Sequence, residues 1–370
     1  MRHLTLRASL STSITVSALL ACACGSAVVD QPGPAPVDPR IYQDAGPRVV
    51  VHAKTPEELA RAERETATEV LNGYAEDGFK ASIPLLDPEG NLSFPGLSEA
   101  TDRTGDVKVL ADLFGAFSDR KFAIGRVWQP PHVAVLEWTM AGVQTGEFVG
   151  IKATQKPVTL HGLSIYWFDA NGLVNDTHLY YDVGATLAAL GAAPKGVEAA
   201  LAGTGASPAP ADAVMAGVSA TETVKRNVAL VNASWDAFEA KNEAGYLAAL
   251  SDDVEVFRLD RAKSERGKAE RKKFFKAAST GIGSLSQTPL NAWGVGDFVI
   301  EEYSITGVHS GKLFDLPASG HALRLHFVDI DEVKDGKVVR TWTYGNSLEL
   351  YAEAGLVAHA APGATATVPK

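Results

Sequence analysis

The spacing of hydrophobic residues predicts helices after two capping patterns. The first pattern is Thr-Pro-Glu-Glu at 55–58, and the second is Ser-Ala-Thr-Glu at 219–222. Each is followed by apolar or small side chains every three or four residues, as on the buried stripe of a helix. A further helix is expected over 106–117. The two stripes consist of Leu59, Ala62, Thr66, Val70 and Tyr74, and of Val224, Val228, Val231, Trp235 and Phe238.

Alternating apolar and polar residues predict strands later in the same two regions. Tight turns separate these strands. Helices followed by antiparallel strands are typical of an α+β domain, in which the helices cover one face of a curved sheet. The expected strands are 132–140, 157–168 and 173–181 in the first region, and 297–305, 322–333 and 337–344 in the second.

The chain contains an internal repeat as long as a domain. Residues 160–181 are echoed by 325–345, and Gly142 and Gly307 extend the match upstream with an offset of 165. After the turn the offset becomes 164, where Asp-Ala-Asn-Gly in the first copy meets Lys-Asp-Gly in the second. Such a difference belongs in a loop. The repeat therefore predicts two homologous domains in tandem.

Composition between these regions places the domain boundaries. The segments before and between the copies are rich in Ala, Gly and Pro and are expected to be a tether and a linker. The expected organisation is a signal peptide with lipobox (1–24), a disordered tether (25–54), domain 1 (55–192), a linker (193–218), domain 2 (219–357) and a disordered tail (358–370).

The N-terminus has the features of an export signal. Arg2 and Arg7 precede a short apolar stretch that ends on small residues. Leu-Leu-Ala-Cys at 19–22 resembles a lipobox, which predicts acylation of Cys22; Cys24 is the weaker candidate, and a plain signal peptide is the alternative. We expect a periplasmic or outer-membrane lipoprotein of the cell envelope, attached to the membrane only through its lipid anchor. No other stretch has the ~20 apolar residues that a spanning helix needs.

Charge argues against a nucleic-acid partner. The formal net charge is −10, and it becomes −12 once Arg2 and Arg7 leave with the leader. The basic residues between 261 and 273 alternate with Glu265 and Glu270, which favours a solvated helix face. Both cysteines of the chain fall in the leader, so no disulfide is expected in the body.

The end of each copy resembles a known family. Val-Leu-Glu-Trp-Thr-Met-Ala-Gly at 135–142, the strand that begins His161-Gly162, the Asp-Ala-Asn-Gly hairpin and a final aromatic strand are similar to the SnoaL-like branch of the nuclear transport factor 2-like superfamily. The second copy has corresponding features at 300–307 and 325–345, with His326 near the start of its strand and Lys-Asp-Gly at its hairpin. This resemblance implies a cone of curved sheet and helices around one apolar pocket, a fold that many unrelated functions share.

Strand alternation predicts which side chains face that pocket. One face of the last two strands of the first copy carries histidines, a carboxylate and a phenol among apolar groups, as small-molecule sites do. The expected ligand-binding residues are Trp138, Ile165, Trp167, His178 and Tyr180 in the first copy, and Tyr303, His326, Arg340, Trp342 and Tyr344 in the second.

The resemblance also implies an acid/base pair. In the polyketide-cyclase branch, an acidic residue on the last strand works with the histidine of the preceding strand, and these roles fall on Asp176 and His161. Arg340 and Trp342 stand where the first copy has Asp176 and His178, so catalysis is expected in the first domain only. A carboxylate in an apolar pocket has a raised pKa and can remove a proton α to a carbonyl without a metal or cofactor.

Alternatives stay open from sequence alone. The histidines could satisfy buried backbone groups, and His161, His178 and Asp176 could hold zinc. The chain could be a cofactor-free cyclase, isomerase or hydrolase acting on a small hydrophobic ligand, or a non-catalytic envelope protein that binds one. It could also be an interaction module, because the open sheet face of this fold commonly pairs with another copy, either in a homodimer or between the two domains.

Overall fold

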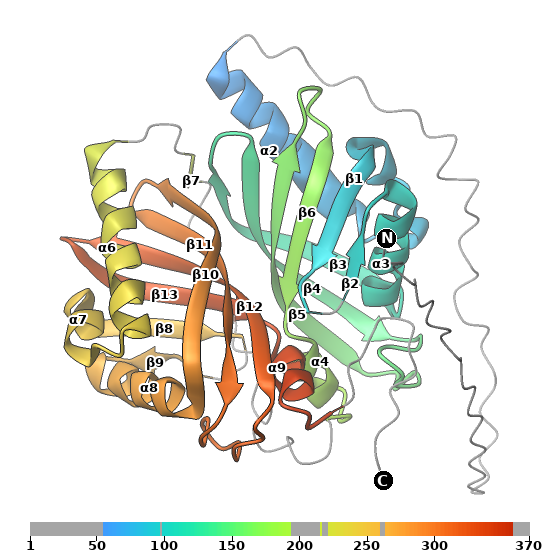
Figure 1. The fold of residues 1–370 in the computed structure, drawn as a ribbon. Coiled ribbons are helices and arrows are strands. Elements are labelled where there is room, and N and C mark those ends of the chain that lie inside the picture. The colour runs from blue at the N-terminus through green and yellow to red at the C-terminus, as the bar shows by residue number, and fades with distance from the viewer. Residues whose placement is uncertain (1–54, 97, 194–214, 217–220, 260–262, 358–370) are drawn as a thin grey trace, which may run out of the picture. The chain divides into compact units, whose positions relative to one another are not determined.

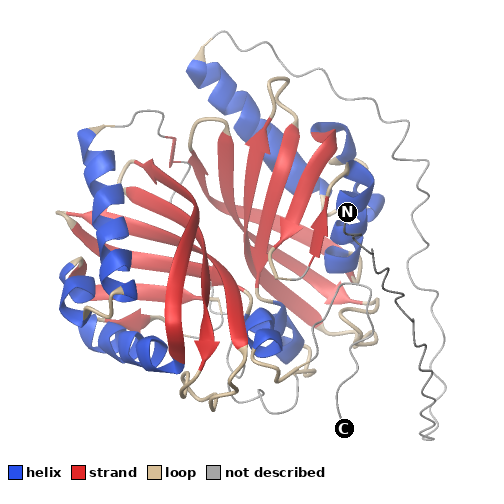
Figure 2. Cartoon of the chain, in the orientation of Figure 1, coloured by secondary structure: helices blue, strands red, loops and turns tan. Residues whose placement is uncertain are grey.

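The computed structural model describes residues 55–96, 98–193, 215–216, 221–259 and 263–357 (Figure 1). The predicted signal peptide with Cys22, the tether, most of the linker and the tail lie outside these residues. Each repeat folds into one sheet with helices against it, so the predicted α+β architecture of two tandem cones is confirmed (Figure 2). The helices are α2 (Pro56–Gly73), α3 (Arg103–Phe114), α4 (Val183–Ala189), α6 (Glu222–Glu239), α7 (Glu243–Ala248), α8 (Lys268–Gly281) and α9 (Ser347–Glu353).

Capping residues fix where the long helices begin. Thr55 and Glu58 form the predicted capping box of α2. In the second repeat Thr221 is the N-cap of α6, and its side chain accepts a hydrogen bond from the backbone of Val224. Helix α3 begins three residues before its predicted start because Asp102 caps it, accepting from the Gly105 amide. The N-cap side chains therefore set the first residue of each of these helices more closely than the apolar stripe does.

The first sheet has the strand order β2-β1-β6-β5-β4-β3-β7, and the second has β10-β11-β12-β13-β8-β9. The predicted strands are present within a few residues. The first sheet contains β1 (Leu86–Phe94), β2 (Ser98–Ala100), β3 (Phe117–Gln129), β4 (Val133–Gln144), β5 (Pro157–Phe168), β6 (Val174–Tyr181) and β7 (Met215–Ala216). The second contains β8 (Leu250–Arg258), β9 (Glu265–Arg266), β10 (Ile282–Val295), β11 (Phe298–His309), β12 (Ala322–Lys334) and β13 (Lys337–Gly345).

The sequence patterns predicted six strands, and β1, β2, β3, β7, β8, β9 and β10 were not among them. Of these, β1 and β8 lie between the helices and pair parallel with the last strand of each repeat. Strand β1 includes Pro88 and Gly90, and its register shifts between Leu86 and Asn91, so it shows no regular alternation. The order of helices first and strands last is therefore only partly correct. These parallel partners complete the wall of each cone beside the final strand.

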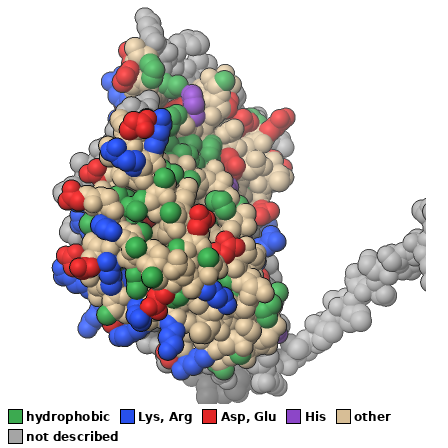
Figure 3. All heavy atoms as spheres, turned by 60° about the vertical axis from the view of Figure 1, so that its left-hand side comes forward, with side chains coloured by type: hydrophobic (Ala, Val, Ile, Leu, Met, Phe, Trp, Pro, Cys, Tyr) green, Lys and Arg blue, Asp and Glu red, His purple; other side chains and the backbone are tan. Residues whose placement is uncertain are grey.

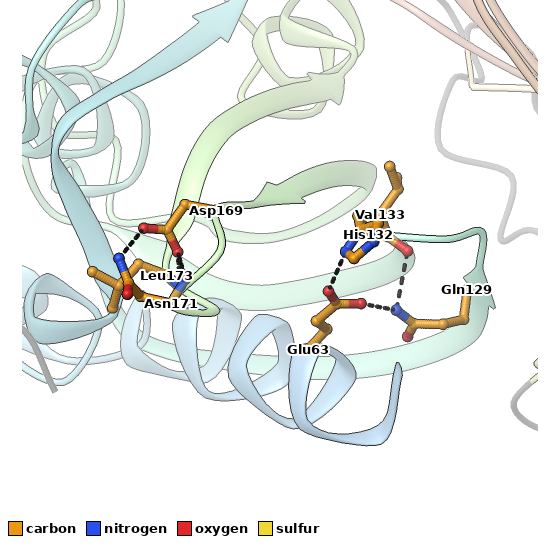
Figure 4. A network of polar contacts seen from close by, with 7 residues as sticks. All are labelled: Glu63, Gln129, His132, Val133, Asp169, Asn171 and Leu173. Carbon is orange, nitrogen blue, oxygen red and sulfur yellow. Dashed lines mark hydrogen bonds and ion pairs between the residues drawn. The ribbon is translucent and has the colours of Figure 1, made fainter. Parts of the chain in front are cut away.

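The hairpin that differs between the repeats is stabilised in the first copy by hydrogen bonds from its backbone to a side chain. Asp169 Oδ1 accepts from the backbone of Asn171 and of Leu173, both at 2.8 Å (Figure 4). Gly172 has φ 75°, which favours glycine. The second copy turns on Asp335 and Gly336, both with positive φ. The extra residue thus lies in the turn, as the change of offset indicated.

A second polar network ties α2 to the neighbouring hairpin. Buried Glu63 lies 3.1 Å from Nδ1 of His132, while Gln129 contacts both Glu63 and the carbonyl of Val133 (Figure 4). Burial raises the pKa of Glu63, although His132 opposes the shift. The network joins α2 to the end of β3 and so fixes the helix on its sheet.

Candidate functional site

The face of β5 and β6 that was predicted to line a pocket carries the expected residues, but it contacts the second repeat. Leu163 pairs with Tyr180, Ile165 with His178 and Trp167 with Asp176, so these side chains share one face. That face packs against the second repeat rather than around a cavity. The apolar cluster that joins the repeats consists of Trp128, Val133, Val135, Leu163, Ile165, Tyr180, Leu259, Val295, Ile300, Val328, Ile330, Trp342 and Tyr344.

The contacts between the repeats are reciprocal. Tyr180 donates to Glu302 Oε1 at 2.7 Å, and Tyr344 donates to Glu137. Tyr344 is the repeat partner of Tyr180, as Glu302 is of Glu137. The last helices follow the same rule: Asp182 accepts from Ser347, while Asn346 accepts from Val183. Such an arrangement, in which i contacts j and j contacts i, has the form of an isologous interface.

The two buried glutamates have different counter-charges. Arg126 holds Glu137 by two contacts of 2.7 Å and lies 3.7 Å from the centroid of the Trp342 ring. Glu302 instead has His178 Nδ1 at 2.5 Å. Burial alone would lower the pKa of His178, but Glu302, Asp176 and Glu99 outweigh burial and raise it. An arginine stays charged at any ordinary pH, whereas a histidine does not.

Stability should therefore depend on pH through His178. Its folded pKa is raised, so its contribution is complete below the unfolded value of about 6.5 and is lost as pH rises through the folded pKa. The pKa of Glu302 is lowered by its hydrogen bonds despite burial, so the ion pair persists down to acidic pH. We expect the stability difference between wild type and His178→Gln, measured by urea unfolding, to shrink from pH 6 to pH 9. A constant difference across this range would contradict the assignment.

The predicted acid/base pair is not formed. Asp176 lies opposite Trp167, while His161 comes six residues earlier on β5, about 20 Å along the strand. Asp176 lies 3.8 Å from His178 and next to the interface, and burial raises its pKa. Among the described residues no three His, Cys, Asp or Glu side chains are placed to hold a metal ion. The strand register therefore separates Asp176 from His161, although the family resemblance had implied that they act together.

A cavity of about 80 Å³ lies on the opposite, helix-covered face of the second sheet. Because a water molecule needs roughly 10–15 Å³ of such space, the cavity has room for several waters or a small organic group. Its apolar lining includes Trp235, Phe238, Phe274, Ala278, Ile282, Leu285, Ile305, Leu313, Phe314, Leu325, Phe327 and Leu350. Its polar lining is Arg258, Arg271, Tyr303, Asp329 and Thr343. A mostly apolar hollow with a few convergent polar groups is the usual form of a ligand site.

Asp329 is the central polar group of this cavity. The Tyr303 hydroxyl donates to its Oδ2 at 3.0 Å, and the residue is 5 % exposed. Burial raises the pKa of Asp329, although Thr343 and Tyr303 oppose the shift. Two neighbouring carboxyls behave alike: burial followed by repulsion from nearby acids raises the pKa of Glu301 to about 8 and that of Asp331 to about 7. The strands thus bring three acids into a poorly solvated region, where protonation near neutral pH is favoured.

Two arginines provide positive charge beside these acids. Arg271 contacts Tyr246 through Nε and Nη2, and its Nη1 lies 3.0 Å from Glu265. Its guanidinium lies 4.2 Å from the centroid of the Phe274 ring, and that of Arg258 lies 5.5 Å from the same centroid. Arg271 is 8 % exposed. The prediction of a solvated basic face is therefore wrong for this residue.

The other basic residues of α8 fit the prediction better. Side chains of Lys272 and Lys273 are 60 % and 74 % exposed and pair with Glu243 and Glu270. On the face shown in Figure 3, acidic side chains lie among the lysines and arginines. The charges are mixed in sign, so this face provides no uniform positive patch.

The cavity adjoins another hollow near the end of β13. A second hollow of about 60 Å³ shares Arg258, Phe314, Phe327, Thr343 and Leu350 with it. This hollow is also lined by Asn346 and Ser347 at the start of α9, and by Asp182 of the first repeat. The two hollows therefore share part of their walls near the helix ends where the repeats meet.

The same positions in the first repeat are filled differently. Trp138 stands where the second repeat has Tyr303, and Ser164 where it has Asp329; the indole donates to the serine at 3.0 Å. Trp138, Phe114 and Tyr181 pack together there with centroid separations of 5.8–6.1 Å. The first cone therefore has a bulky indole and a serine at these two positions, whereas the second has a phenol and a carboxyl. The sequence predicted catalysis in the first domain, but that domain has no acidic residue at these two positions.

The predicted ligand-binding residues lie in five different places. Tyr303 lines the cavity and Trp138 is in the first core. Ile165, Tyr180, Trp342 and Tyr344 belong to the apolar cluster between the repeats, Trp167 packs against this cluster, and His178 contacts Glu302 there. His326 contacts Glu349, and Arg340 contacts Glu332.

A detectable sequence pattern does point to Asp329. The run Leu-His-Phe-Val-Asp-Ile-Asp at 325–331 alternates, and its odd positions place two aspartates on the same face as Leu325 and Phe327. Acids within an apolar strand face are unusual unless they have partners. The family pattern drew attention to the other face, and the bulge at Trp167/Phe168 moves Val174 to the first core.

Two cones of curved sheet and helix, one with an acid at the base of a cavity, define a nuclear transport factor 2-like protein. The SnoaL-like polyketide cyclase family matches residues 98–190 and 229–354, more than half of the chain. The chain therefore belongs to this family, with two copies of its domain.

Solved structures that resemble parts of the chain do so at low identity. A putative SnoaL-like polyketide cyclase from Jannaschia sp. CCS1 is 17% identical, with 37% of this chain and 97% of that one covered and a TM-score of 0.35. TsrD from Streptomyces laurentii is 20% identical over 38% and 100%, with a TM-score of 0.33. A putative polyketide cyclase from Xanthomonas campestris is 24% identical over 36% and 99%, with a TM-score of 0.32. A search of curated proteins found no match. No helix among the described residues has the length and hydropathy to cross a membrane.

Proposed function

We propose that the second domain binds a small, largely apolar carbonyl compound and that Asp329 acts on it as a general acid or base. The observation that carries this proposal is a cavity of about 80 Å³ that reaches a buried carboxyl. A raised pKa makes the Asp329 carboxylate a stronger base toward a proton α to a carbonyl. Tyr303, Arg258 and Arg271 line the same space, and their donors or positive charge would stabilise the resulting enolate.

Each step uses groups of the chain alone. The carboxylate takes the α-proton, the electron pair moves onto the carbonyl oxygen, and the proton returns at another carbon or after ring closure. Such proton transfers contribute roughly 10² to 10⁴ in rate. Cofactor-free isomerisation or cyclisation is the reaction class that fits this donor set.

Binding is tested first with a variant that fills the cavity. Ala278 lines it on α8, while its neighbour Ala277 does not. We expect Ala278→Leu to weaken binding of acetophenone, an apolar carbonyl probe, at least tenfold in calorimetry, because the added carbons occupy the ligand's space. Ala277→Leu is the matched control and should bind as wild type does. Equal binding by both variants would show that the cone is not the site.

Location and assembly are parts of the same proposal. The predicted export signal at 1–24 supports a ligand that the protein meets at the cell envelope. Alternatively, the protein binds and carries such a ligand there without turning it over. We also propose that the contact between the repeats takes the place of a homodimer of single domains, since its reciprocal hydrogen bonds have that symmetry.

A further inference from the structure

His161 and His326 hold the same position in their repeats. His161 lies opposite Thr139 and His326 lies opposite Ser304, and in both repeats the ladder to the final strand begins at the next residue. The backbone N–H of each histidine therefore points toward the last helix of its repeat and not toward a strand partner. The second repeat shows what such a position can bind.

In the second repeat the partner is a carboxylate. Glu349 Oε2 accepts from the backbone N–H of His326 at 3.0 Å, and its Oε1 lies 2.6 Å from His326 Nδ1. Glu349 belongs to α9 and is 3 % exposed. One residue thus holds a buried carboxylate at two points, through its main chain and its ring.

In the first repeat the corresponding residue of α4 is Ala185, 164 residues before Glu349. Ala185 carries no acceptor, and a cavity of about 40 Å³ lies beside it, lined also by His161, Thr186, Leu160 and Tyr181. Nδ1 of His161 is buried and has no hydrogen-bond partner among the described residues. Since a water occupies roughly 10–15 Å³ of such space, the cavity matches a carboxylate with a short carbon chain.

The acidic residue of the lining, Asp182, does not occupy this position. Asp182 directs Oδ1 to the backbone of Ala185 and to the backbone and hydroxyl of Ser347, so that oxygen is engaged at the helix ends. We propose that His161 and the cavity beside Ala185 bind the carboxylate of a small organic acid, in the way that His326 binds Glu349. This site lies in the first repeat, so it stands or falls independently of the acid/base chemistry proposed for the second.

Titration of the full chain with acetate tests the site directly. With histidine rings labelled for NMR and His161 assigned from His161→Gln, sodium acetate should move the His161 resonance saturably, and sodium chloride at equal ionic strength should not. The His326 resonance should stay in place, because Glu349 already occupies that site. A His161 resonance that acetate does not move, or moves no more than chloride does, would overturn the proposal.

Exchanging the two residues provides matched controls. Ala185→Glu should shift the His161 resonance without acetate and abolish its response, because the chain then supplies the carboxylate. Glu349→Ala should make His326 respond to acetate. If Ala185→Glu fails to fold, Ala185→Leu, which fills the cavity with carbon, should also abolish the response. Retention of the acetate response in a folded Ala185 variant, or an unresponsive His326 in Glu349→Ala, would refute the equivalence on which the site rests.

Discussion

Asp329→Asn should abolish proton exchange while leaving ligand binding within a few-fold of wild type. Asparagine keeps the shape of the side chain and an oxygen that can accept from Tyr303, but it cannot take a proton. We expect the exchange of acetophenone α-protons into heavy water, followed by proton NMR, to fall by about 10² to 10⁴. Calorimetric affinity for acetophenone provides the parallel measurement of binding.

Asp176→Asn is the matched control for this experiment. Asp176 is the acid that the family pattern selected, but it lies beside His178 and does not line the cavity of the second cone. Its variant should exchange protons at the wild-type rate. If Asp176→Asn lost exchange and Asp329→Asn kept it, the chemistry would belong to the face between the repeats.

Arg126→Ala should cause the largest loss of stability among the interface variants. Arg126 and Glu137 have side chains only 5% and 4% exposed, and the pair lies at the apolar cluster between the repeats. Removing the guanidinium leaves a buried carboxylate whose one remaining hydrogen-bond partner among the described residues is the Tyr344 hydroxyl. Breaking a buried ion pair on one side typically costs about 3–5 kcal/mol. Urea unfolding of the full chain measures this loss.

The repeat supplies the control for Arg126. Asn291 occupies the equivalent position and donates to Glu302 at 2.6 Å, but His178 and Tyr180 also contact that carboxylate. Asn291→Ala should therefore cost less, about 1.5 kcal/mol. Adding Glu137→Gln to the Arg126 variant should recover most of its loss, because no unpaired charge remains. An Arg126→Ala protein as stable as wild type would mean that the pair contributes little to folding.

Local patterns predicted much of each domain. The capping box at Thr55 and Glu58 and the alternation of β5 and β12 depend on residues close together in the chain, so sequence alone indicated them. The single-residue offset correctly located the difference between the hairpins. By contrast, β1 and β8 form because a distant final strand lies beside them, and no local pattern reveals that pairing.

The sequence by itself determined the two copies, their α+β class and the set of residues that share each strand face. Only the tertiary structure decided what each strand face contacts. Alternation shows which residues share a face, but it does not say whether that face lies against a helix, a cavity or a neighbouring domain. His178 and Tyr180 therefore lie against the second repeat, while Asp329 lines the cavity. The equivalence of Ala185 and Glu349 likewise depends on tertiary structure, because α4 and α9 each lie against the equivalent histidine of their own repeat.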